Sequence, residues 1–539
     1  ITMVTRFERL PNEIFLSICD YLSPTHIIYA FYTLNSRFNY LINMFYISET
    51  SISLVNVDES MFHHFRCKLF PKIQNHIARL RLSGISQVLT KKFSNKFSNL
   101  ASLQLILNNM KDIQTLLWYS KSLGISKSLV ELSIIFEICS HQDETKMLLN
   151  KLYRSLLFQP GRQQCSLVSL SITGPPCLSL TINHYLMRPC YLRRLTVHLI
   201  SYNDLLILFN NLPLVEYFSV VLEEKIAGFY PYTYENIFSG TKLLSEFQFY
   251  CPSIINYDLV ELLLKQLVTL RKLSLRLCCK FSNGVIDGQR LESGFLTKLT
   301  RLEQFNFCIC SCYMDNGLGV IDDYFLSTFQ TDYWIKEKRW KIGFYPMPYV
   351  FVFYITFSLP FAFDVFDSTS TDLLKYRTNF GSVDDNNNDN WKQVKNLYLF
   401  DNKSYTQKFF QLIHEKFSNV KQITIENHLS IEENEKIISL PSVDSVRFVS
   451  LNKYRTNAQH VKQLLLMTPN IRQLKISYIL LARATNYFRD QRLKKICSHL
   501  VQLDVDSYPE QWLYGDGLTM NTYAQRFKTY FPNLLNSCI

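Results

Sequence analysis

One short pattern of apolar residues recurs through most of this chain, and it restricts the fold more than any other feature. The pattern is Leu-x-x-Leu-x-Leu with apolar substitutions, and most steps between neighbouring copies are 23 to 32 residues long. Alternating apolar residues of this kind are typical of a strand with one buried face. The fourteen copies begin at Ile77, Leu100, Leu129, Leu167, Leu192, Val215, Leu244, Leu270, Leu302, Val394, Val420, Val443, Ile471 and Leu500.

Stretches with helical periodicity lie between these copies. They include residues 258–268, 406–417 and 457–467. Repeated strand–helix units stack on one another, because no single unit can bury its own apolar face. The sequence therefore predicts an α/β solenoid with parallel strands on one side and helices outside them.

Over residues 77 to about 515 the chain resembles leucine-rich-repeat proteins, whose repeats are about 20–29 residues long. The resemblance implies a horseshoe whose concave strand surface binds partners. An ordinary α/β domain with leucine-rich strands is the alternative.

One long step interrupts the repeats. It spans 92 residues between the copies at Leu302 and Val394. Within it, residues 347–363 carry no charge, which would also suit a membrane span. However, Pro346, Pro348 and Pro360 interrupt any helix there, and the stretch is shorter than the ~20 residues that a span needs. We therefore expect aromatic strands packed on the repeats, a polar loop at 382–390, and no membrane segment.

Three short amphipathic segments precede the repeats. Pro11 would lie in the first turn of the first helix, where its missing N–H costs nothing. Ser23-Pro24 ends that segment and caps the second. Such small helices bury little surface among themselves and need a partner or a neighbouring domain. Their apolar faces carry Ile14, Ile18 and Leu22, then Ile27, Ile28 and Phe31, then Leu34, Phe38, Leu41, Ile42 and Phe45.

This N-terminal module resembles the F-box. The matching residues are Leu10, Pro11, Glu13, Ile14, Ile18, Tyr21, Leu22, Ser23, Pro24, Ile27, Ile28, Leu34, Arg37, Phe38, Leu41 and Ile42. In that family the helices dock on the Skp-type linker subunit of a cullin-RING ubiquitin ligase. The resemblance thus implies a partner-binding set consisting of Leu10, Pro11, Ile14, Ile18, Leu22, Ile27 and Ile28.

The module departs from the family pattern at two places. Thr25-His26 stands where a Lys-Asp pair is usual, and Phe38 stands where Trp is common. A plain helical cap on the repeat domain is the alternative to a functional F-box.

The chain shows no pattern typical of an enzyme. It holds only 15 glycines and contains no P-loop, dinucleotide-binding glycine pattern or nucleophile elbow. Cys308, Cys310 and Cys312 would share one face of a strand, but the second cysteine pair that a zinc site needs is not apparent. We therefore expect no catalytic residues, no cofactor and no metal.

The net charge and the cysteines indicate which kind of partner and which cellular compartment to expect. A net charge of +12 is modest for a chain of 539 residues, and the aromatics lie mostly at core positions, so a nucleic-acid partner is not expected. Fourteen cysteines without regular spacing do not resemble a secreted disulfide framework. The expected location is the cytoplasm or the nucleus.

The remaining candidate surface is formed by the x positions of the strands, which point away from the buried leucines. Arg194, Lys272 and Arg276 occupy such positions and could together bind an acidic protein substrate. The sequence favours a non-catalytic substrate adaptor that joins the linker subunit and cullin to that substrate. A repeat scaffold without ligase activity is the alternative.

These patterns divide the chain into five segments. We expect an F-box at 1–50, a linker or cap at 51–76, a first repeat block at 77–329, an insertion with aromatic strands and a polar loop at 330–391, and a second repeat block with a C-terminal cap at 392–539.

Overall fold

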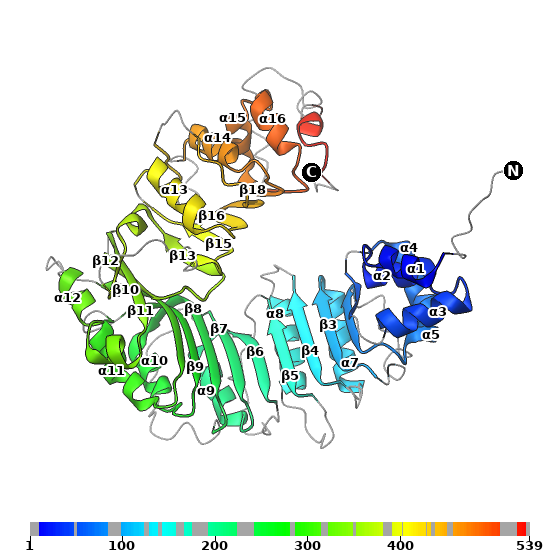
Figure 1. Ribbon diagram of the computed structural model, residues 1–539, viewed down its shortest axis with the longest axis horizontal. Helices are drawn as coiled ribbons and strands as arrows, with labels where there is room; N and C mark the ends of the chain where they lie inside the picture. The colour runs from blue at the N-terminus through cyan, green and yellow to red at the C-terminus, as the bar shows by residue number, and fades with distance from the viewer. Residues whose placement is uncertain are drawn as a thin grey trace. The chain divides into compact units, whose positions relative to one another are not determined.

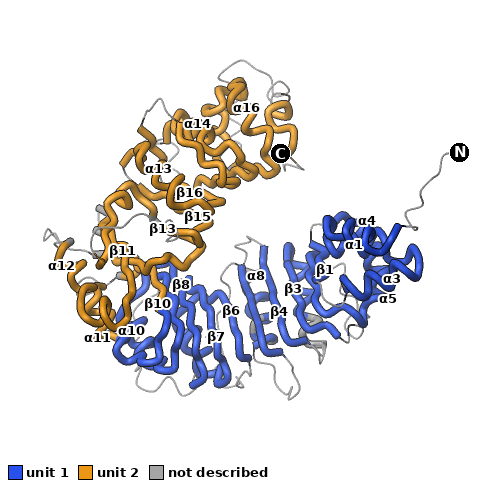
Figure 2. Tube along the Cα trace, in the orientation of Figure 1, with its two compact units in different colours: residues 1–278, 295–304 blue, residues 279–294, 305–539 orange. Residues whose placement is uncertain are grey.

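The computed structural model has an α/β fold in which short N-terminal helices precede a long series of strands with helices between them (Figure 1). Two compact units are distinguished: residues 1–278 with 295–304, and residues 279–294 with 305–539 (Figure 2). The structure describes residues 10–47, 51–55, 57–84, 97, 99–122, 129–137, 143–157, 167–174, 192–223, 242–280, 286–313, 322–348, 352–380, 391–401, 403–426, 428–432, 437–449, 456–506, 525 and 527–534.

All fourteen copies of the repeat pattern form strands, as predicted. The first block supplies β2 (Arg79–Ser83), β3 (Ser102–Leu107), β4 (Glu131–Phe136), β5 (Ser169–Thr173), β6 (Arg194–Leu199), β7 (Tyr217–Leu222), β8 (Glu246–Asn256), β9 (Lys272–Lys280) and β10 (Gln304–Tyr313). The second block supplies β15 (Asn396–Leu399), β16 (Gln422–Glu426), β17 (Ser445–Val449), β18 (Gln473–Ser477) and β19 (Gln502–Asp506). Strands β2 to β8 pair in parallel in chain order, and so do β15 to β19.

The leucine pattern explains the burial of each strand. In β6, Leu195, Val197 and Leu199 are fully buried, whereas the intervening side chains are exposed or half-buried. Helix α9 (Tyr202–Asn211) covers the apolar face, because the ring of Phe209 lies 5.2 Å from that of Phe218 on β7. The opposite face of the strands carries the polar x positions.

The helices expected between the strands are present. Residues 258–268, 406–417 and 457–467 correspond to α10 (Tyr257–Leu264), α13 (Gln407–Lys416) and α14 (Ala458–Met467). Thr406 and Asn457 cap the last two, since their side chains accept hydrogen bonds from backbone N–H groups in the first turn. The other helices near the strands are α7 (Met110–Ser122), α8 (Asp143–Leu157), α11 (Gly288–Gly294), α12 (Asp322–Ser327), α15 (Tyr478–Ala484) and α16 (Gln491–Cys497).

The parallel series of strands is interrupted at the predicted insertion. After β10 the sheet continues with two antiparallel strands, β12 (Val352–Leu359) and then β11 (Lys341–Pro348), and ends at the short β14 (Arg377–Thr378). A separate six-stranded sheet runs from β13 (Val365–Thr369) through β15 to β19. The break follows from the sequence, because the repeat pattern stops after β10 and aromatic strands replace it.

The insertion contains the expected aromatic strands, β11 and β12, and one repeat strand that the pattern missed. Strand β13 pairs in parallel with β15, and Asp364 accepts backbone bonds from both Lys395 and Asn396. A β-bulge between Phe366 and Thr369 places the polar residue Thr369 opposite Leu399, so the strand does not match a leucine search. The predicted loop at 382–390 lies outside the described residues.

No helix within the described ranges is both long enough and apolar enough to cross a membrane.

The N-terminal module has the three predicted helices, α1 (Asn12–Cys19), α2 (Pro24–Phe31) and α3 (Ser36–Ile42), followed by a π-helical turn, η2 (Asn43–Ile47). Helix α1 begins one residue after Pro11, and Ser23 caps α2 by accepting a bond from His26 N. Phe15 and Phe38 are fully buried and stack at 4.5 Å between ring centroids. Phe38 therefore forms the centre of this small core.

Residues 51–76, expected as a linker or cap, join the module to the repeats. They form β1 (Ser51–Leu54), α4 (Glu59–His64), a π-helical turn η3 (Phe65–Leu69) and α5 (Phe70–Ile73). Strand β1 pairs in parallel with β2 and so begins the sheet. Buried Thr25 of α2 hydrogen-bonds to this strand. Its hydroxyl donates to Ser53 O at 2.9 Å and accepts from Ser53 N at 3.1 Å. The helices thus cap the first edge of the sheet.

Thr25→Val should lower the free energy of unfolding by about 1–3 kcal/mol, because valine keeps the shape but leaves two backbone groups of Ser53 without their partner. Urea unfolding measures the loss, and amide hydrogen exchange at residues 51–54 should accelerate. Thr25→Ser, which keeps the hydroxyl, is the control and should retain slow exchange at Ser53. Unchanged exchange in Thr25→Val would show that these bonds do not hold β1.

Candidate functional site

The first candidate surface lies on α1 and α2. Of the predicted partner-binding set, Pro11, Ile14 and Leu22 are exposed, with Ile14 at 48% and Leu22 at 39% of their full accessibility. Leu10 and Ile18 are half-buried.

Two members of the predicted set need correction. Ile27 and Ile28 have no accessible surface, because they face the interior of the module. They can support a partner surface from beneath but cannot touch a partner in this conformation. The candidate contact set is therefore Leu10, Pro11, Ile14, Ile18 and Leu22, which we call the α1 surface.

Arg37 of α3 fixes the start of the α1 surface. Its Nε donates to Asn12 Oδ1 at 2.7 Å, and its Nη2 donates to Leu10 O. The guanidinium also lies 5.7 Å from the centroid of the Phe38 ring. Arg37 thereby holds Leu10 and Asn12 against α3 and leaves Pro11 exposed between them.

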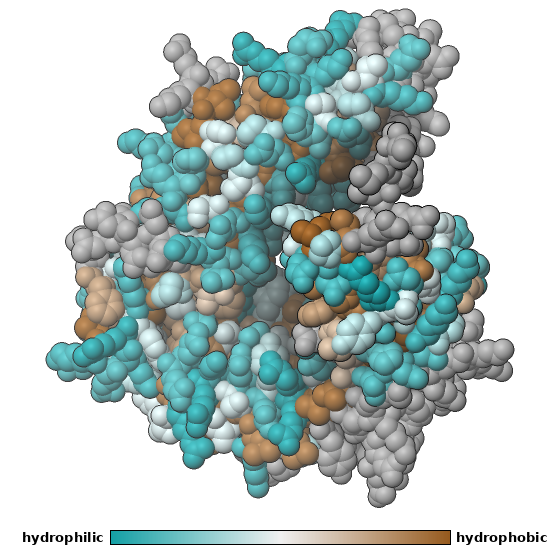
Figure 3. Space-filling view, turned by 45° about the vertical axis from the view of Figure 1, so that its right-hand side comes forward, coloured by the Kyte–Doolittle hydropathy of each residue, from teal (hydrophilic) through white to brown (hydrophobic). Residues whose placement is uncertain are grey.

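Further apolar side chains, outside the predicted partner-binding set, are exposed on the same module. They are Tyr21, Tyr29, Leu34, Tyr40, Met44 and Phe45. The part of the molecule that comes forward in Figure 3 includes this module, and apolar surface is visible there among polar side chains. Several large exposed apolar side chains on one small module are a feature that protein interaction surfaces share.

The second candidate surface is the polar face of β2 to β9 in the first unit. Equivalent x positions lie side by side because the strands pair in register. One row holds Arg79, Ser102, Glu131, Ser169, Arg194, Tyr217 and Glu246. The next row holds Arg81, Gln104, Ser133, Ser171, Thr196, Ser219 and Gln248.

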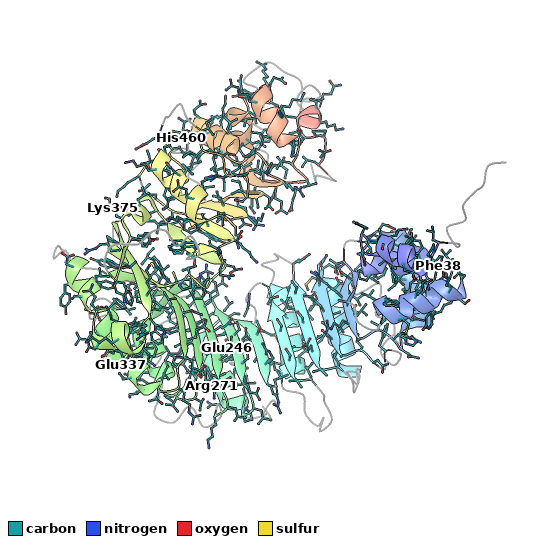
Figure 4. The ribbon with its side chains drawn as sticks, in the orientation of Figure 1. Phe38, Glu246, Arg271, Glu337, Lys375 and His460 are labelled. Carbon is teal, nitrogen blue, oxygen red and sulfur yellow. The ribbon has the colours of Figure 1, made fainter. Side chains whose placement is uncertain are left out.

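Lys272 extends the first row onto β9. Its backbone N–H donates to Ser245 O, just as that of Glu246 donates to Glu216 O one strand earlier. Three strand spacings of about 4.8 Å separate Arg194 from Lys272, so these exposed cations are about 14 Å apart. Both lie on the predicted face, and Glu246 (labelled in Figure 4) lies between them in the same row, on β8.

Arg276 lies on the same face, but little of its side chain is accessible to a binding partner. It is only 9% exposed, and its guanidinium carbon lies 4.1 Å from the centroid of the Tyr250 ring on β8. Four residues along the strand place it about 13 Å from Lys272. The three predicted cations therefore share one face without forming a compact cluster. Arg194 stacks similarly, 4.7 Å from the Tyr217 ring centroid.

No family model matches this chain. A comparison with curated proteins also finds no match.

In the second sheet the equivalent face is less basic. Lys475 on β18 forms an ion pair with Asp504 on β19, with 3.0 Å between Nζ and Oδ2. Arg447 on β17 is exposed. Within the parts of the chain that the structure describes, no three His, Cys, Asp or Glu side chains are placed to hold a metal ion. Cys308 is buried and Cys310 half-buried on β10.

His198 on β6 is a titratable group on the polar face of the first unit. Burial lowers its pKa below the ordinary value near 6.5, and the hydrogen bond from its Nδ1 to Gly174 O partly opposes that shift. The folded chain therefore keeps His198 neutral at a pH where the unfolded chain takes up a proton. Its contribution to stability is present above about pH 6.5 and is lost as the pH falls from there through the lowered folded pKa.

His198→Gln should remove this part of the pH dependence, because glutamine can still donate to Gly174 O but does not titrate. Urea unfolding at a series of pH values between about 7.5 and 5 tests it. The wild type should lose more stability over that range than the variant. Parallel curves would contradict the assignment.

Proposed function

We propose that this chain is a non-catalytic substrate adaptor of a cullin-RING ubiquitin ligase. In this proposal the α1 surface docks on the Skp-type linker subunit, and the polar strand face, as the concave side of a leucine-rich-repeat horseshoe, recruits a protein substrate. The observation that carries it is the exposure of Pro11, Ile14 and Leu22 on a module whose opposite side is buried against β1.

This division of surfaces fits an adaptor. One side of the helices is used by Thr25 and the buried Ile27 and Ile28, so it cannot bind a second protein. The other side presents apolar residues that gain stability when a partner removes them from water. Ubiquitin transfer would then depend on proximity, because tethering raises the effective concentration of the substrate near the conjugating enzyme.

A repeat scaffold without ligase activity is the second candidate. The contact of Thr25 with Ser53 favours it, since Thr25 stands where the F-box family usually has Lys and here serves the sheet edge. Affinity purification of the full chain followed by mass spectrometry separates the two. Recovery of the linker and cullin supports the adaptor, and recovery of other partners without them supports the scaffold.

Substrate capture should depend on the two exposed cations Arg194 and Lys272 of the first row. Reversing Arg194 and Lys272 together to Glu changes the local charge by four, and both side chains are exposed. If the substrate is acidic, the variant should recover less of it, and the remaining binding should be less sensitive to salt.

Arg301→Glu is the matched control, because Arg301 is exposed in the turn ahead of β10 and off the strand face. It should capture the same substrates as the wild type. Linker binding should be unchanged in both variants. Equal capture by the row variant and the control would exclude this face as the recruitment site.

A further inference from the structure

Three aromatic rings meet beside the turn that leads from η6 (Tyr333–Glu337) into β11 in the second unit. The rings of Tyr333 and Trp340 are nearly perpendicular, at 83°, with centroids 6.3 Å apart. Trp334 lies 5.8 Å from the first and 5.9 Å from the second. Trp334 is completely buried, whereas Tyr333 and Trp340 are half-buried, so part of each of these two residues is accessible to solvent.

The ammonium group of Lys338 occupies this corner. Its Nζ lies 5.8 Å from the ring centroid of Tyr333 and 5.4 Å from that of Trp340. Both distances fall within the ~6 Å at which a cation is attracted by the negative face of an aromatic ring. One cation is therefore held by two rings at once.

The backbone is bent to make this arrangement. Lys338 N donates to Tyr333 O at 2.9 Å, and Trp340 N donates to Trp334 O at 3.1 Å. Between them Arg339 has a φ of +54°, a left-handed conformation that is uncommon for a residue with a long side chain. Such strain persists where surrounding contacts enforce it, and it is concentrated at functional sites.

Two carboxylates act on the hydroxyl of Tyr333. Burial raises the pKa of the Tyr333 hydroxyl, and the carboxylates of Glu292 and Glu337 raise it further. Glu292 on α11 is held by Thr331, whose hydroxyl donates to its Oε2 at 2.9 Å. Glu337 is labelled in Figure 4 and is exposed. These two carboxylates add to the attraction that the rings exert on a cation in the corner.

We propose that Tyr333 and Trp340, supported from beneath by buried Trp334, form an aromatic cage for the methylated ammonium group of a ligand, and that Lys338 fills the cage until that ligand displaces it. Aromatic cages bind quaternary ammonium groups well, because methyl groups contact the rings and the cation is weakly hydrated. The primary ammonium of Lys338 is strongly hydrated by comparison and competes less well. The proposal is independent of the N-terminal helices and of ligase function.

The experiment uses the full chain, its Lys338→Ala variant and tetramethylammonium chloride as the probe, with binding followed by calorimetry at constant ionic strength. Emptying the cage should tighten binding roughly tenfold, because the ligand no longer competes with an internal cation. Choline and N-acetyl-trimethyllysine amide are then compared, and the tighter of the two identifies a free small molecule or a protein side chain as the source of the group. The uncharged isostere of choline, 3,3-dimethylbutan-1-ol, should bind much more weakly than choline.

Two further variants keep the test decisive. Trp340→Leu in the Lys338→Ala background should abolish binding, and its unfolding curve shows whether it is folded. Glu292→Gln changes no ring and should weaken binding by a smaller factor. The proposal is overturned if Lys338→Ala shows no saturable binding of any of the three ammonium probes, if the uncharged isostere binds as well as choline, or if folded Trp340→Leu binds unchanged.

Discussion

Replacing Trp391 by alanine should lower the free energy of unfolding by about 3–5 kcal/mol, because it removes the largest ring from the aromatic centre of the second unit. Trp391 is almost completely buried. Its ring centroid lies 5.2 Å from those of Phe357 and Phe366, 4.9 Å from that of Phe417 and 5.6 Å from that of Phe361. These rings come from the antiparallel insertion and from the second block of repeats, so one side chain joins both.

Urea unfolding followed by circular dichroism measures the effect. Tyr324→Ala is the control, because Tyr324 is an aromatic residue of the same unit that is 61% exposed on α12. Its replacement should change stability by no more than about 0.5 kcal/mol. If Trp391→Ala cost as little as the control, the aromatic centre would not be what joins the insertion to the repeats.

The strands of the repeats could be predicted from sequence because the signal is local. Each copy needs only alternating apolar residues to make one buried face, and a helix after it to cover that face. Caps such as Thr406 and Asn457 could be predicted in the same way, since the capping side chain and the backbone N–H groups that donate to it lie within one turn.

The order of the strands in the insertion could not be predicted, because pairing partners are set by contacts far apart in the sequence. Strand β12 pairs with β10 rather than continuing the parallel series, and no short pattern encodes that choice. Strand β13 was missed because a β-bulge places Thr369, rather than an apolar residue, opposite Leu399.

One recurring sequence feature next to the repeat copies was not used in the sequence analysis. An asparagine directly before three of the repeat copies donates its side-chain amide to a backbone carbonyl 24 to 29 residues earlier in the chain. These residues are Asn99, Asn419 and Asn470, and Asn533 makes the same kind of bond to Ser498 O near the C-terminus.

The candidate sites were predicted in part for the same physical reason. The face on which Arg194, Lys272 and Arg276 lie follows from alternation along each strand. Whether a cationic side chain remains exposed to solvent depends on the residue beside it on the adjacent strand. The ring of Tyr250 on β8 covers the guanidinium of Arg276 on β9. The cage around Lys338 could not be foreseen, because it depends on the left-handed turn at Arg339.

The second large effect concerns docking. Ile14→Asp combined with Leu22→Asp should remove binding to the Skp-type linker subunit while the chain remains folded. Both side chains are substantially exposed, so the charges cost little in the free chain. At an interface each would bury an unpaired carboxylate and lose an apolar anchor worth about 2 kcal/mol, which together lowers affinity more than about 100-fold.

Val268→Asp is the matched control. Val268 is also an aliphatic residue of the first unit, is 51% exposed, and lies after α10 rather than on the α1 surface. It should bind the linker subunit like the wild type. In urea unfolding, the free energy of unfolding of both variants should lie within about 0.5 kcal/mol of that of the wild type.

The most direct test of the adaptor is a calorimetric titration of the purified full chain with a recombinant Skp-type linker subunit from the same organism. We expect saturable binding that the Ile14→Asp, Leu22→Asp variant abolishes and Val268→Asp retains. Absence of binding by the folded wild type, or equal binding by the two variants, would contradict the proposal that the N-terminal helices are a docking module as well as a cap.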